Sequence, residues 1–292
     1  MVQPGGFWVR AGALMLGSVA FGASLGWFVA RSMRDRRRPR KPWRIYLMRH
    51  GESTGNVDRN LFTFVPDHAI PLTGEGARQA SAAGKTLRAM VGDDDVRFWV
   101  SPYQRARQTF DLVATHFDAG KVSVREEPRL REQDWGNFQD CEIIAECRRL
   151  RRKFGPFFYR IPAGESGADV FDRVSSFLES LYRDFDASRA QHVVLISHGL
   201  TCRLFLMRFL HWPFEKFERT KNLDNCEILI LERQADNRYA LITPVEETPM
   251  AAHDEWDEYA RCKDHHNPSS ASSPPEPLSP ASRHRKLISN LV

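Results

Sequence analysis

The chain has 292 residues, 42% of them hydrophobic and 11% aromatic, which suits one large globular domain or two small ones. Its net charge of +5 first suggests nucleic acid or anionic lipid as a partner. However, residues 31–44 hold eight basic residues and one acid, and Arg10 adds one positive charge, so residues 45–292 carry a net charge of −3. The main body is therefore not expected to bind nucleic acid.

The five cysteines form no Cys-x-x-Cys pair, which argues against a disulfide scaffold or zinc ribbon and favours a reducing compartment.

The first predicted element is a membrane-spanning helix over residues 11–30, which follows an N-terminal segment of residues 1–10. Its twenty residues carry no charge and form a helix about 30 Å long, enough to cross a bilayer core. The basic linker of residues 31–43 follows. This charge asymmetry places the rest of a single-pass protein on the cytosolic side, for example of an outer organelle membrane. The alternative is an arginine-rich transit segment for a chloroplast or mitochondrion.

Small residues recur at every fourth position of this span, at Ser18, Gly22, Gly26 and Ala30. Such spacing lets membrane helices pack closely, which suggests a weak homo-oligomer through this face. The basic linker lies directly beside the span. Anionic lipid, rather than nucleic acid, is therefore its expected partner.

Strands and helices alternate after the linker, which predicts an α/β domain over residues 44–245. The expected strands are apolar runs at residues 44–49, 97–101, 121–127, 192–197, 227–232 and 238–243, the last two forming a hairpin. The expected helices, which begin and end near these bounds, cover residues 72–91, 103–117, 168–185 and 200–210. Residues 246–292 are rich in Pro and Ser and are predicted to be a mostly disordered tail.

Two of these strands, the first and the fourth, are each followed by a His-Gly pair, His50-Gly51 and His198-Gly199. The ends of parallel strands lie at one edge of a sheet, so the two histidines can meet there. Each glycine allows a close approach of the backbone and leaves an amide that can bind an anion. The repeated pair therefore indicates a binding site at this edge.

Two arginines are expected at the same edge. Arg49 ends the first strand, and Arg105 lies one helical turn past the end of the second. Two guanidinium groups beside two imidazoles suit phosphate or sulfate. A loop over residues 130–139, which contains Trp and Gly, supplies the carboxylates of Glu132 and Asp134. The pattern predicts an anion site with an acid beside it.

These motifs occur in the order found in a known family. The chain resembles the histidine phosphatase (phosphoglycerate mutase-like) superfamily over residues 44–245, and it looks closest to a plant and fungal branch. The resemblance rests on LMRHGES, LTGEG, SPYQRARQT, LREQDWGNFQ, GES and VVLISHG, together with Asn56 and a Pro-Asp-His segment at residues 66–68. It implies a mostly parallel central sheet with helices on both faces, a three-layer sandwich.

The resemblance also implies a role for each matching residue. His50 is expected to be the nucleophile that takes the phosphoryl group from a phosphorylated substrate, and Glu132 the acid that protonates the leaving oxygen. The groups expected to hold the phosphoryl oxygens are Arg49, Arg105, His198, Ser53, Asn56 and the amide of Gly199. Because the arginines supply positive charge, neither a metal nor a cofactor is expected.

The main hypothesis is thus a membrane-anchored phosphatase that works through a phosphohistidine. One alternative is a phosphoglycerate mutase-like phosphotransferase. The family's mutases seal their substrate with a long insertion, whereas only 24 residues, 140–163, lie here between the acid loop and the GES motif. The other alternative is a non-catalytic membrane adaptor, which is disfavoured because all five catalytic side chains are present.

Several nearby residues have more than one interpretation. Asp134 is the alternative acid, and His68 can approach the site through its loop. The basic run RRLRRK at residues 148–153 is expected to be a solvated helix face, with binding of an acidic substrate as the weaker alternative. Trp135 and Phe138 are expected to be packing residues that form at most a rim of the pocket.

Overall fold

The computed structural model describes residues 41–137, 140–188 and 190–247. The predicted membrane span, all but the end of the basic linker, Phe138 and nearly all of the predicted tail lie outside these ranges. Within them, no helix combines the length and the apolar character needed to cross a membrane.

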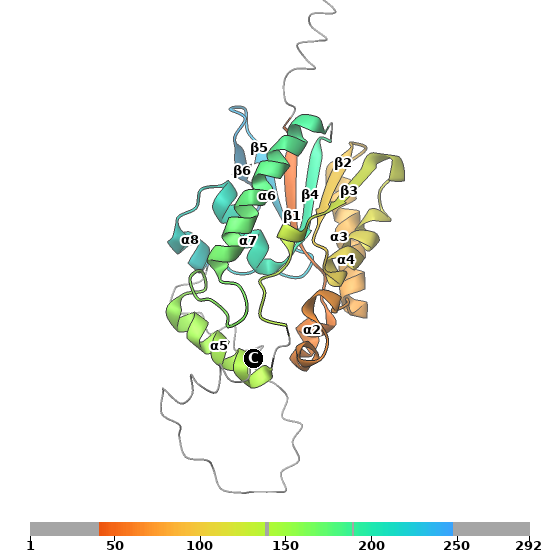
Figure 1. Ribbon diagram of the computed structural model, residues 1–292. Helices are drawn as coiled ribbons and strands as arrows, with labels where there is room; N and C mark the ends of the chain where they lie inside the picture. Colours follow the sequence, from red (N-terminus) through yellow and green to blue (C-terminus); the bar gives the residue numbers. More distant parts are fainter. Residues whose placement is uncertain (1–40, 138–139, 189, 248–292) are drawn as a thin grey trace, which may run out of the picture.

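The centre of the domain is a six-stranded sheet with the order β3-β2-β4-β1-β5-β6 (Figure 1). Its strands are β1 (Arg44–Arg49), β2 (Val96–Val100), β3 (Val122–Glu126), β4 (His192–Ser197), β5 (Ile228–Arg233) and β6 (Tyr239–Leu241). The first four strands pair in parallel, whereas β5 runs antiparallel to β1 and β6 antiparallel to β5. The predicted α/β class and the closing hairpin are confirmed.

Helices of different lengths connect the strands. The α-helices are α2 (Thr54–Val57), α3 (Gly74–Val91), α4 (Gln104–Ala114), α5 (Cys141–Phe154), α6 (Gly167–Ala187), α7 (Gly199–Phe209) and α8 (Phe214–Arg219). The short 3-10 helices are η1 (Arg59–Thr63), η2 (Asp67–Ala69), η3 (Ala119–Lys121) and η4 (Pro128–Leu130). Four of the α-helices, α3, α4, α6 and α7, correspond to the four predicted from apolar spacing.

Successive side chains of the central strands point to opposite faces of the sheet, and each face has its own helices. In β1, Ile45 and Leu47 pack with α6 and α7, whereas Tyr46 and Met48 pack with α3 and α4. Figure 1 shows these two pairs of helices on opposite sides of the sheet. Because both faces are covered, the inner residues of β1 and β4 are buried in succession and do not alternate with exposed polar residues.

Local signals set the beginnings of the two longest helices. The Thr73 hydroxyl accepts a hydrogen bond from the Gly76 amide at the start of α3, and Ser166 and Asp169 form a capping box at the start of α6. A Cβ on Gly76 would lie 2.0 Å from the carbonyl oxygen of Glu52. Glycine at this position therefore allows α3 to begin directly against the loop that follows β1.

The register of the sheet brings the two His-Gly pairs to the same level. Arg49 of β1 lies beside Ser197 of β4, and the amide of His50 donates to the carbonyl oxygen of Ser197 at 2.9 Å. Strand β2 lies on the other side of β4, and the helix that follows it, α4, carries Arg105 in its first turn. The carboxyl ends of three parallel strands thus supply the histidines and this arginine.

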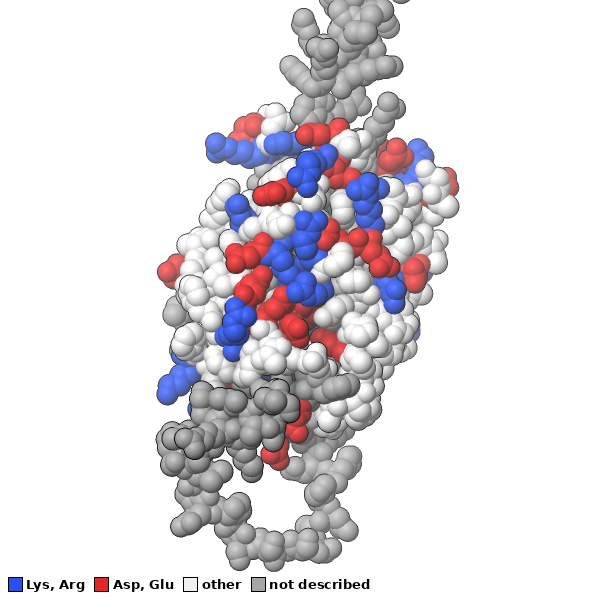
Figure 2. Space-filling view, viewed as in Figure 1, with Lys and Arg blue, Asp and Glu red and all other residues white. Residues whose placement is uncertain are grey.

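The face of the domain that carries α6 has interleaved positive and negative side chains (Figure 2). Two of its ion pairs connect α6 to its surroundings, Arg97 to Asp184 at 2.9 Å and Arg173 to Glu165 at 3.0 Å. The positive charges on this face therefore have acidic neighbours, in keeping with the small net charge of the main body.

Candidate active site

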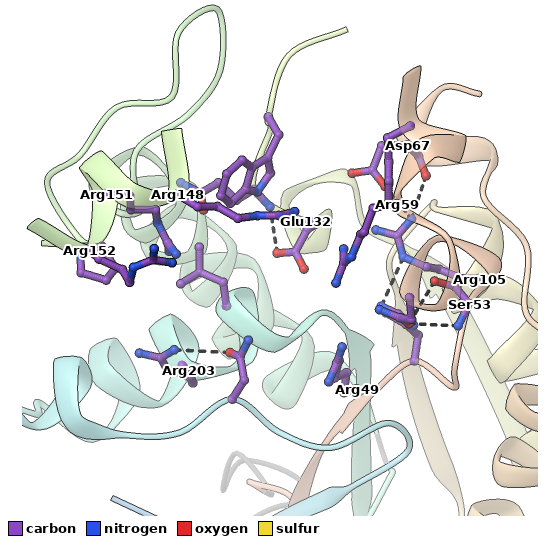
Figure 3. Close-up of a pocket in the computed structure, with 18 residues that line it drawn as sticks. Arg49, Ser53, Arg59, Asp67, Arg105, Glu132, Arg148, Arg151, Arg152 and Arg203 are labelled. Carbon is purple, nitrogen blue, oxygen red and sulfur yellow. Dashed lines mark hydrogen bonds and ion pairs between the residues drawn. The ribbon is translucent and has the colours of Figure 1, made fainter. Parts of the chain in front are cut away.

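A cavity of about 150 Å³ opens at the carboxyl end of β1 (Figure 3). Six of the eight residues that the sequence proposes for the site line it: Arg49, His50, Ser53, Asn56, Arg105 and Glu132. The other two, His198 and Gly199, are buried and are not part of its lining.

The hydrogen bonds of His50 define which ring nitrogen carries the proton. Nδ1 lies 2.7 Å from the carbonyl oxygen of Gly51, and Nε2 lies 3.2 Å from Nε of Arg105. A carbonyl oxygen can only accept and a guanidinium can only donate. The proton therefore lies on Nδ1, and Nε2 presents its lone pair to Arg105.

The surroundings of His50 keep the imidazole neutral. Burial, followed by the positive charges of Arg105 and Arg49, lowers the pKa of His50 well below its usual value of 6.5. At neutral pH the lone pair on Nε2 is therefore present, as a nucleophile requires.

Arg105 is positioned by two neighbours. Its Nη1 donates to Oδ1 of Asp67 at 2.8 Å and to the carbonyl oxygen of the same residue at 2.7 Å. Its guanidinium also lies over the ring of Tyr103, 4.9 Å from the centroid. The Pro-Asp-His segment thus holds Arg105 over His50 through its aspartate. His68 does not line the cavity, and its ring lies 6.5 Å from that of Tyr103, centroid to centroid.

The end of β1 and the segment that leads into α2 supply three polar groups to the cavity wall. Nη1 of Arg49 donates to the carbonyl oxygen of Leu223 at 2.6 Å. The amide and the hydroxyl of Ser53 both donate to Oδ1 of Asn56, at 2.9 and 3.0 Å. Since Oδ1 of Asn56 holds the loop in this way, its side-chain nitrogen is the group that can donate to an anion.

His198 lies directly behind His50, with ring centroids 5.1 Å apart. Its Nε2 is 2.8 Å from the hydroxyl of Ser101, and its Nδ1 has no hydrogen-bond partner among the described residues and lies 4.0 Å from Oε2 of Glu132. Burial, with the charges of Arg105 and His50, lowers the pKa of His198 well below 6.5. If the Ser101 hydroxyl donates to Nε2, the proton of the neutral ring lies on Nδ1, on the side of the ring that faces Glu132.

Gly199 is buried beside the cavity and is not part of its lining. It begins α7, and a Cβ at this position would lie 3.0 Å from the side chain of Asn222. Gly199 does not line the cavity, and the contact of its amide with phosphate stays a prediction. The absence of a side chain instead lets Asn222 lie against the start of α7.

Glu132 is the carboxylic acid that faces the histidines. Its side chain is 23% exposed, and its Oε1 accepts a hydrogen bond from the Gln133 amide at 2.9 Å. Burial raises the pKa of Glu132, and the Gln133 amide and Arg105 partly offset this effect. The alternative acid, Asp134, does not line the cavity, and its Oδ1 accepts the Gly136 amide at 2.8 Å.

Arg173 of α6 holds the backbone that carries Glu132. Its guanidinium donates to the carbonyl oxygens of Arg129, Arg131 and Glu132 at 2.6, 2.9 and 3.0 Å. It also pairs with Glu165 of the GES motif at 3.0 Å. Arg173 therefore positions the acid from a distance, and no motif in the sequence marks this residue beyond the presence of its acidic partner in GES.

The basic run of α5 is a solvated helix face only in part, since Arg149 and Lys153 are exposed, and the expectation is wrong for three of its arginines. Arg148, Arg151 and Arg152 line the cavity (Figure 3). The reason is their spacing, since Arg148 and Arg151 lie four and seven residues after the buried Ile144 and continue the inward side of the helix. The guanidinium groups of Arg148 and Arg151 each lie 5.6 Å from the ring centroid of Trp135, which forms a rim of the cavity.

Residues 45–243 match the histidine phosphatase superfamily (branch 1). The chain belongs to this superfamily. The match covers the sheet from the second residue of β1 onward and every residue of the candidate active site.

Related proteins agree with this assignment. Phosphoglycerate mutase-like protein AT74H of Arabidopsis thaliana is 48% identical over 215 residues, which cover 68% of this chain and 76% of that protein. Broad-range acid phosphatase DET1 of Saccharomyces cerevisiae is 29% identical, with 70% of this chain and 89% of that protein covered. The solved structure of a mycobacterial glucosyl-3-phosphoglycerate phosphatase has the same fold, with a TM-score of 0.53, 22% identity, and coverage of 70% and 99%.

The cavity of this superfamily member also has residues that the motifs did not identify. Arg59 of η1 and Arg203 of α7 both line the cavity. No motif marks either of them, because each reaches the site through the packing of its own helix. Among the described residues, no group of three His, Cys, Asp or Glu side chains is placed to hold a metal ion.

Proposed function

We propose that this protein is a phosphatase that hydrolyses a phosphomonoester through a phosphohistidine formed on His50. The observation that carries the proposal is the state of His50, a neutral imidazole whose Nε2 lone pair lies 3.2 Å from a guanidinium nitrogen. Further support is the arrangement of an imidazole, guanidinium groups and a carboxyl group around one cavity. Phosphatases among the relatives support the same chemistry.

In the first step, Nε2 of His50 attacks phosphorus, and the bond between phosphorus and the ester oxygen breaks. Glu132 gives its proton to that oxygen, so the product leaves as a neutral alcohol. The guanidinium groups of Arg49 and Arg105 stabilise the charge on the three other phosphoryl oxygens. Arg105 exchanges its hydrogen bond to Nε2 for one to the phosphoryl group.

In the second step, water attacks the phosphohistidine. The carboxylate of Glu132 accepts a proton from this water, and the phosphorus–nitrogen bond breaks and returns the lone pair to Nε2 of His50. Inorganic phosphate leaves, and Glu132 is again protonated. The two steps consume one water and restore both side chains.

The second candidate function is phosphoryl transfer within a phosphoglycerate, since a relative with 48% identity is named phosphoglycerate mutase-like. The segment over residues 140–163 contains α5 and is short, so it favours access of water. The two functions differ in their products. A mutase converts 3-phosphoglycerate to 2-phosphoglycerate, whereas a phosphatase releases inorganic phosphate from it or leaves it unchanged.

The test uses the full-length protein and a panel of phosphomonoesters. We expect phosphate release from at least one of them, and an acid-labile phosphoryl label on the protein during turnover. His50→Ala should lose both. His211→Asn is the matched control, because this histidine is exposed and lies outside the cavity. Turnover by His50→Ala close to that of the unaltered protein would show that His50 is not the nucleophile.

We further propose that residues 11–30 anchor the protein in a membrane with its catalytic domain facing the cytosol. The support is the uncharged run of twenty residues and the basic linker after it. Carbonate extraction should leave the full-length protein in the membrane pellet, and protease added to intact organelles should digest the domain. If the domain is protected and the mature chain begins beyond residue 30, the segment is a cleaved transit peptide.

A further inference from the structure

An exposed aromatic surface lies between α5 and α8 and has no role in the proposed chemistry. Phe154, the last residue of α5, is 68% exposed, and Phe158 is 59% exposed. The ring of Phe154 lies 6.2 Å from that of Tyr159, centroid to centroid. The ring of Phe158 lies 5.4 Å from that of Phe214, the first residue of α8. Scattered apolar side chains are normal on a protein surface, whereas a contiguous group of them indicates a binding surface.

Basic side chains accompany these rings. Lys153 precedes Phe154 and is exposed, and Nζ of Lys216 lies 4.5 Å from the ring centroid of Trp212. Neither lysine forms an ion pair with any residue of the ranges 41–137, 140–188 and 190–247. The name aromatic–basic patch is used here for Lys153, Phe154, Phe158, Trp212, Phe214 and Lys216. The patch offers apolar contact together with positive charge that the described chain does not pair.

The aromatic–basic patch borders the cavity. Arg152 and Pro156, which stand on either side of Phe154 in the sequence, line the cavity wall. In Figure 3, Arg152 lies on the left, and Arg105 of the catalytic end lies on the right. A ligand that covers the patch therefore lies next to the cavity, on the side away from the catalytic end.

The last described residue of the chain lies close to this patch. Glu247 pairs with Thr220 in an isolated β-bridge, and its Oε2 lies 3.3 Å from Nε of Arg219 at the end of α8. Helix α8 has six residues, so Phe214 at its other end is about 9 Å away along the helix. A segment that begins six residues after Glu247 can lie up to about 20 Å from it. Such a segment reaches the patch without any movement of the domain.

The sequence at this distance is complementary to the patch. Residues 253–259, HDEWDEY, hold four carboxylates and two aromatic rings and no Lys or Arg. Residues 148–160, which carry half of the patch, hold six basic residues and no acidic one. Opposite charges guide two such surfaces together, and aromatic rings supply most of the buried area. The acidic segment follows residue 243, where the match to the superfamily ends, so this contact is a feature of this chain.

An anionic membrane is another occupant that aromatic and basic side chains suit. However, α5 lies at the end of the domain opposite to the start of β1, where the proposed membrane anchor joins it (Figure 1). The acidic segment, in contrast, is tethered beside α8. A short tether gives an effective concentration in the millimolar range, so weak contacts are enough to hold the segment in place. The position of the patch therefore favours the segment.

We propose that residues 253–259 dock on the aromatic–basic patch of the same chain and restrict the access of phosphorylated substrates to the cavity. The rings of Trp256 and Tyr259 cover the exposed phenylalanines, and the carboxylates face the two lysines. Negative charge beside the cavity repels an anionic substrate, so the docked segment is a partial inhibitor. The effect on turnover rests on the proposed phosphatase function, whereas the docking does not.

A photo-crosslinker in the patch identifies its occupant. The full-length protein carries p-benzoylphenylalanine in place of Phe158 and is irradiated in the presence of vesicles of phosphatidylcholine and phosphatidylserine. We expect mass spectrometry to find adducts with residues 253–259 of the same chain. The control carries the crosslinker in place of Val124, which is 45% exposed on β3, on the other side of the domain (Figure 1). Its yield of these adducts should be at least about tenfold lower.

The other outcomes of the crosslinking overturn the docking. Adducts with a second chain, seen as a dimer on a denaturing gel, would assign the patch to another copy of the protein. Adducts with lipid would assign it to a membrane surface. Equal yields from positions 158 and 124 would show that the segment has no preference for the patch.

Kinetics test the effect on access. Neutralising the segment with Asp254→Asn, Glu255→Gln, Asp257→Asn and Glu258→Gln should lower KM for p-nitrophenyl phosphate about twofold to tenfold and leave kcat nearly unchanged. Asp264→Asn with Glu276→Gln is the control, because both residues follow the segment. Adducts at position 158 together with an unchanged KM would reject the inhibition. If no phosphomonoester is hydrolysed at all, the proposed function fails, and the crosslinking still decides whether the segment docks.

Discussion

Replacing Glu132 with glutamine removes the acidic proton and keeps the size of the side chain. Oε1 of Glu132 accepts the Gln133 amide at 2.9 Å, and the carboxamide oxygen of glutamine can accept the same hydrogen bond. We therefore expect Glu132→Gln to fold normally. Within residues 41–137, 140–188 and 190–247, the one other carboxyl group that lines the cavity is that of Asp67, which is paired with Arg105 at 2.8 Å and is not placed to replace Glu132.

The size of the effect depends on the leaving group. An alkoxide is a poor leaving group and needs the proton, so kcat/KM for an alkyl phosphate should fall about 10²–10⁴-fold. This corresponds to about 3–5 kcal/mol of transition-state stabilisation. The nitrophenolate of p-nitrophenyl phosphate leaves without a proton, so the same variant should lose less than about tenfold on this substrate.

The assay measures kcat/KM of the full-length protein and of Glu132→Gln on both substrates. Glu146→Gln serves as the control, since Glu146 is on α5, pairs with Arg149 and does not line the cavity. If Glu132→Gln loses the same factor on the alkyl and the aryl phosphate, the carboxyl group does not protonate the leaving oxygen. The role assigned to Glu132 is then incorrect.

The pH profile gives an independent readout of the same residue. Because the pKa of Glu132 is raised, the acid keeps its proton to higher pH, and activity on the alkyl phosphate should fall as pH rises through that pKa. On the acidic side, activity should fall as His50 becomes protonated, below pH 6.5. In Glu132→Gln the fall on the alkaline side should disappear and the fall on the acidic side should remain.

Asp67→Asn removes the carboxylate that holds Arg105 at 2.8 Å, and a displaced guanidinium should lower kcat about 10²-fold; an unchanged kcat would show that the pair does not position Arg105. Because the pKa of His50 is lowered in the folded chain, this residue is protonated below pH 6.5 in the unfolded chain but not in the folded one. This difference lowers the free energy of unfolding by up to about 1.4 kcal/mol for each pH unit. The urea midpoint should therefore fall less between pH 7 and pH 5 in His50→Gln than in the unaltered protein; the raised pKa of Glu132 acts in the opposite direction in both proteins. Phe177→Ala empties a fully buried core position and should lower the free energy of unfolding by about 3–5 kcal/mol, read from urea titration; a loss below about 1 kcal/mol would contradict the packing described for α6.

The sheet was predictable because its signals are local. Strands β1 and β4 are covered on both faces, so their sequences are continuously apolar, and this pattern is visible without any knowledge of their neighbours. Their parallel pairing then places whatever follows each strand at one edge. The meeting of His50 and His198 is thus a consequence of two short segments and one rule of topology.

The residues that position the catalytic side chains were not predictable in the same way. Asp67 holds Arg105 across 38 positions of the sequence, and Arg173 holds the backbone of Glu132 across 41. Such contacts depend on the packing of loops and helices, and the residue types by themselves favour any of several partners. The position of His198 behind the cavity wall, and not on it, likewise depends on how α7 packs on the sheet.

The sequence by itself determined the residues of the catalytic end, because they stand at fixed positions after strands and in the first turn of a helix. Tertiary structure alone decided what the basic run of α5 does. A row of arginines on a helix looks the same whether it faces water or a cavity, since the local spacing of charges is identical in both cases. Arg148 and Arg151 point inward because the buried Ile144 and Cys147 hold the same side of α5 against the domain. The surface that the two arginines face is formed by Trp135 and by α7, which is distant in sequence.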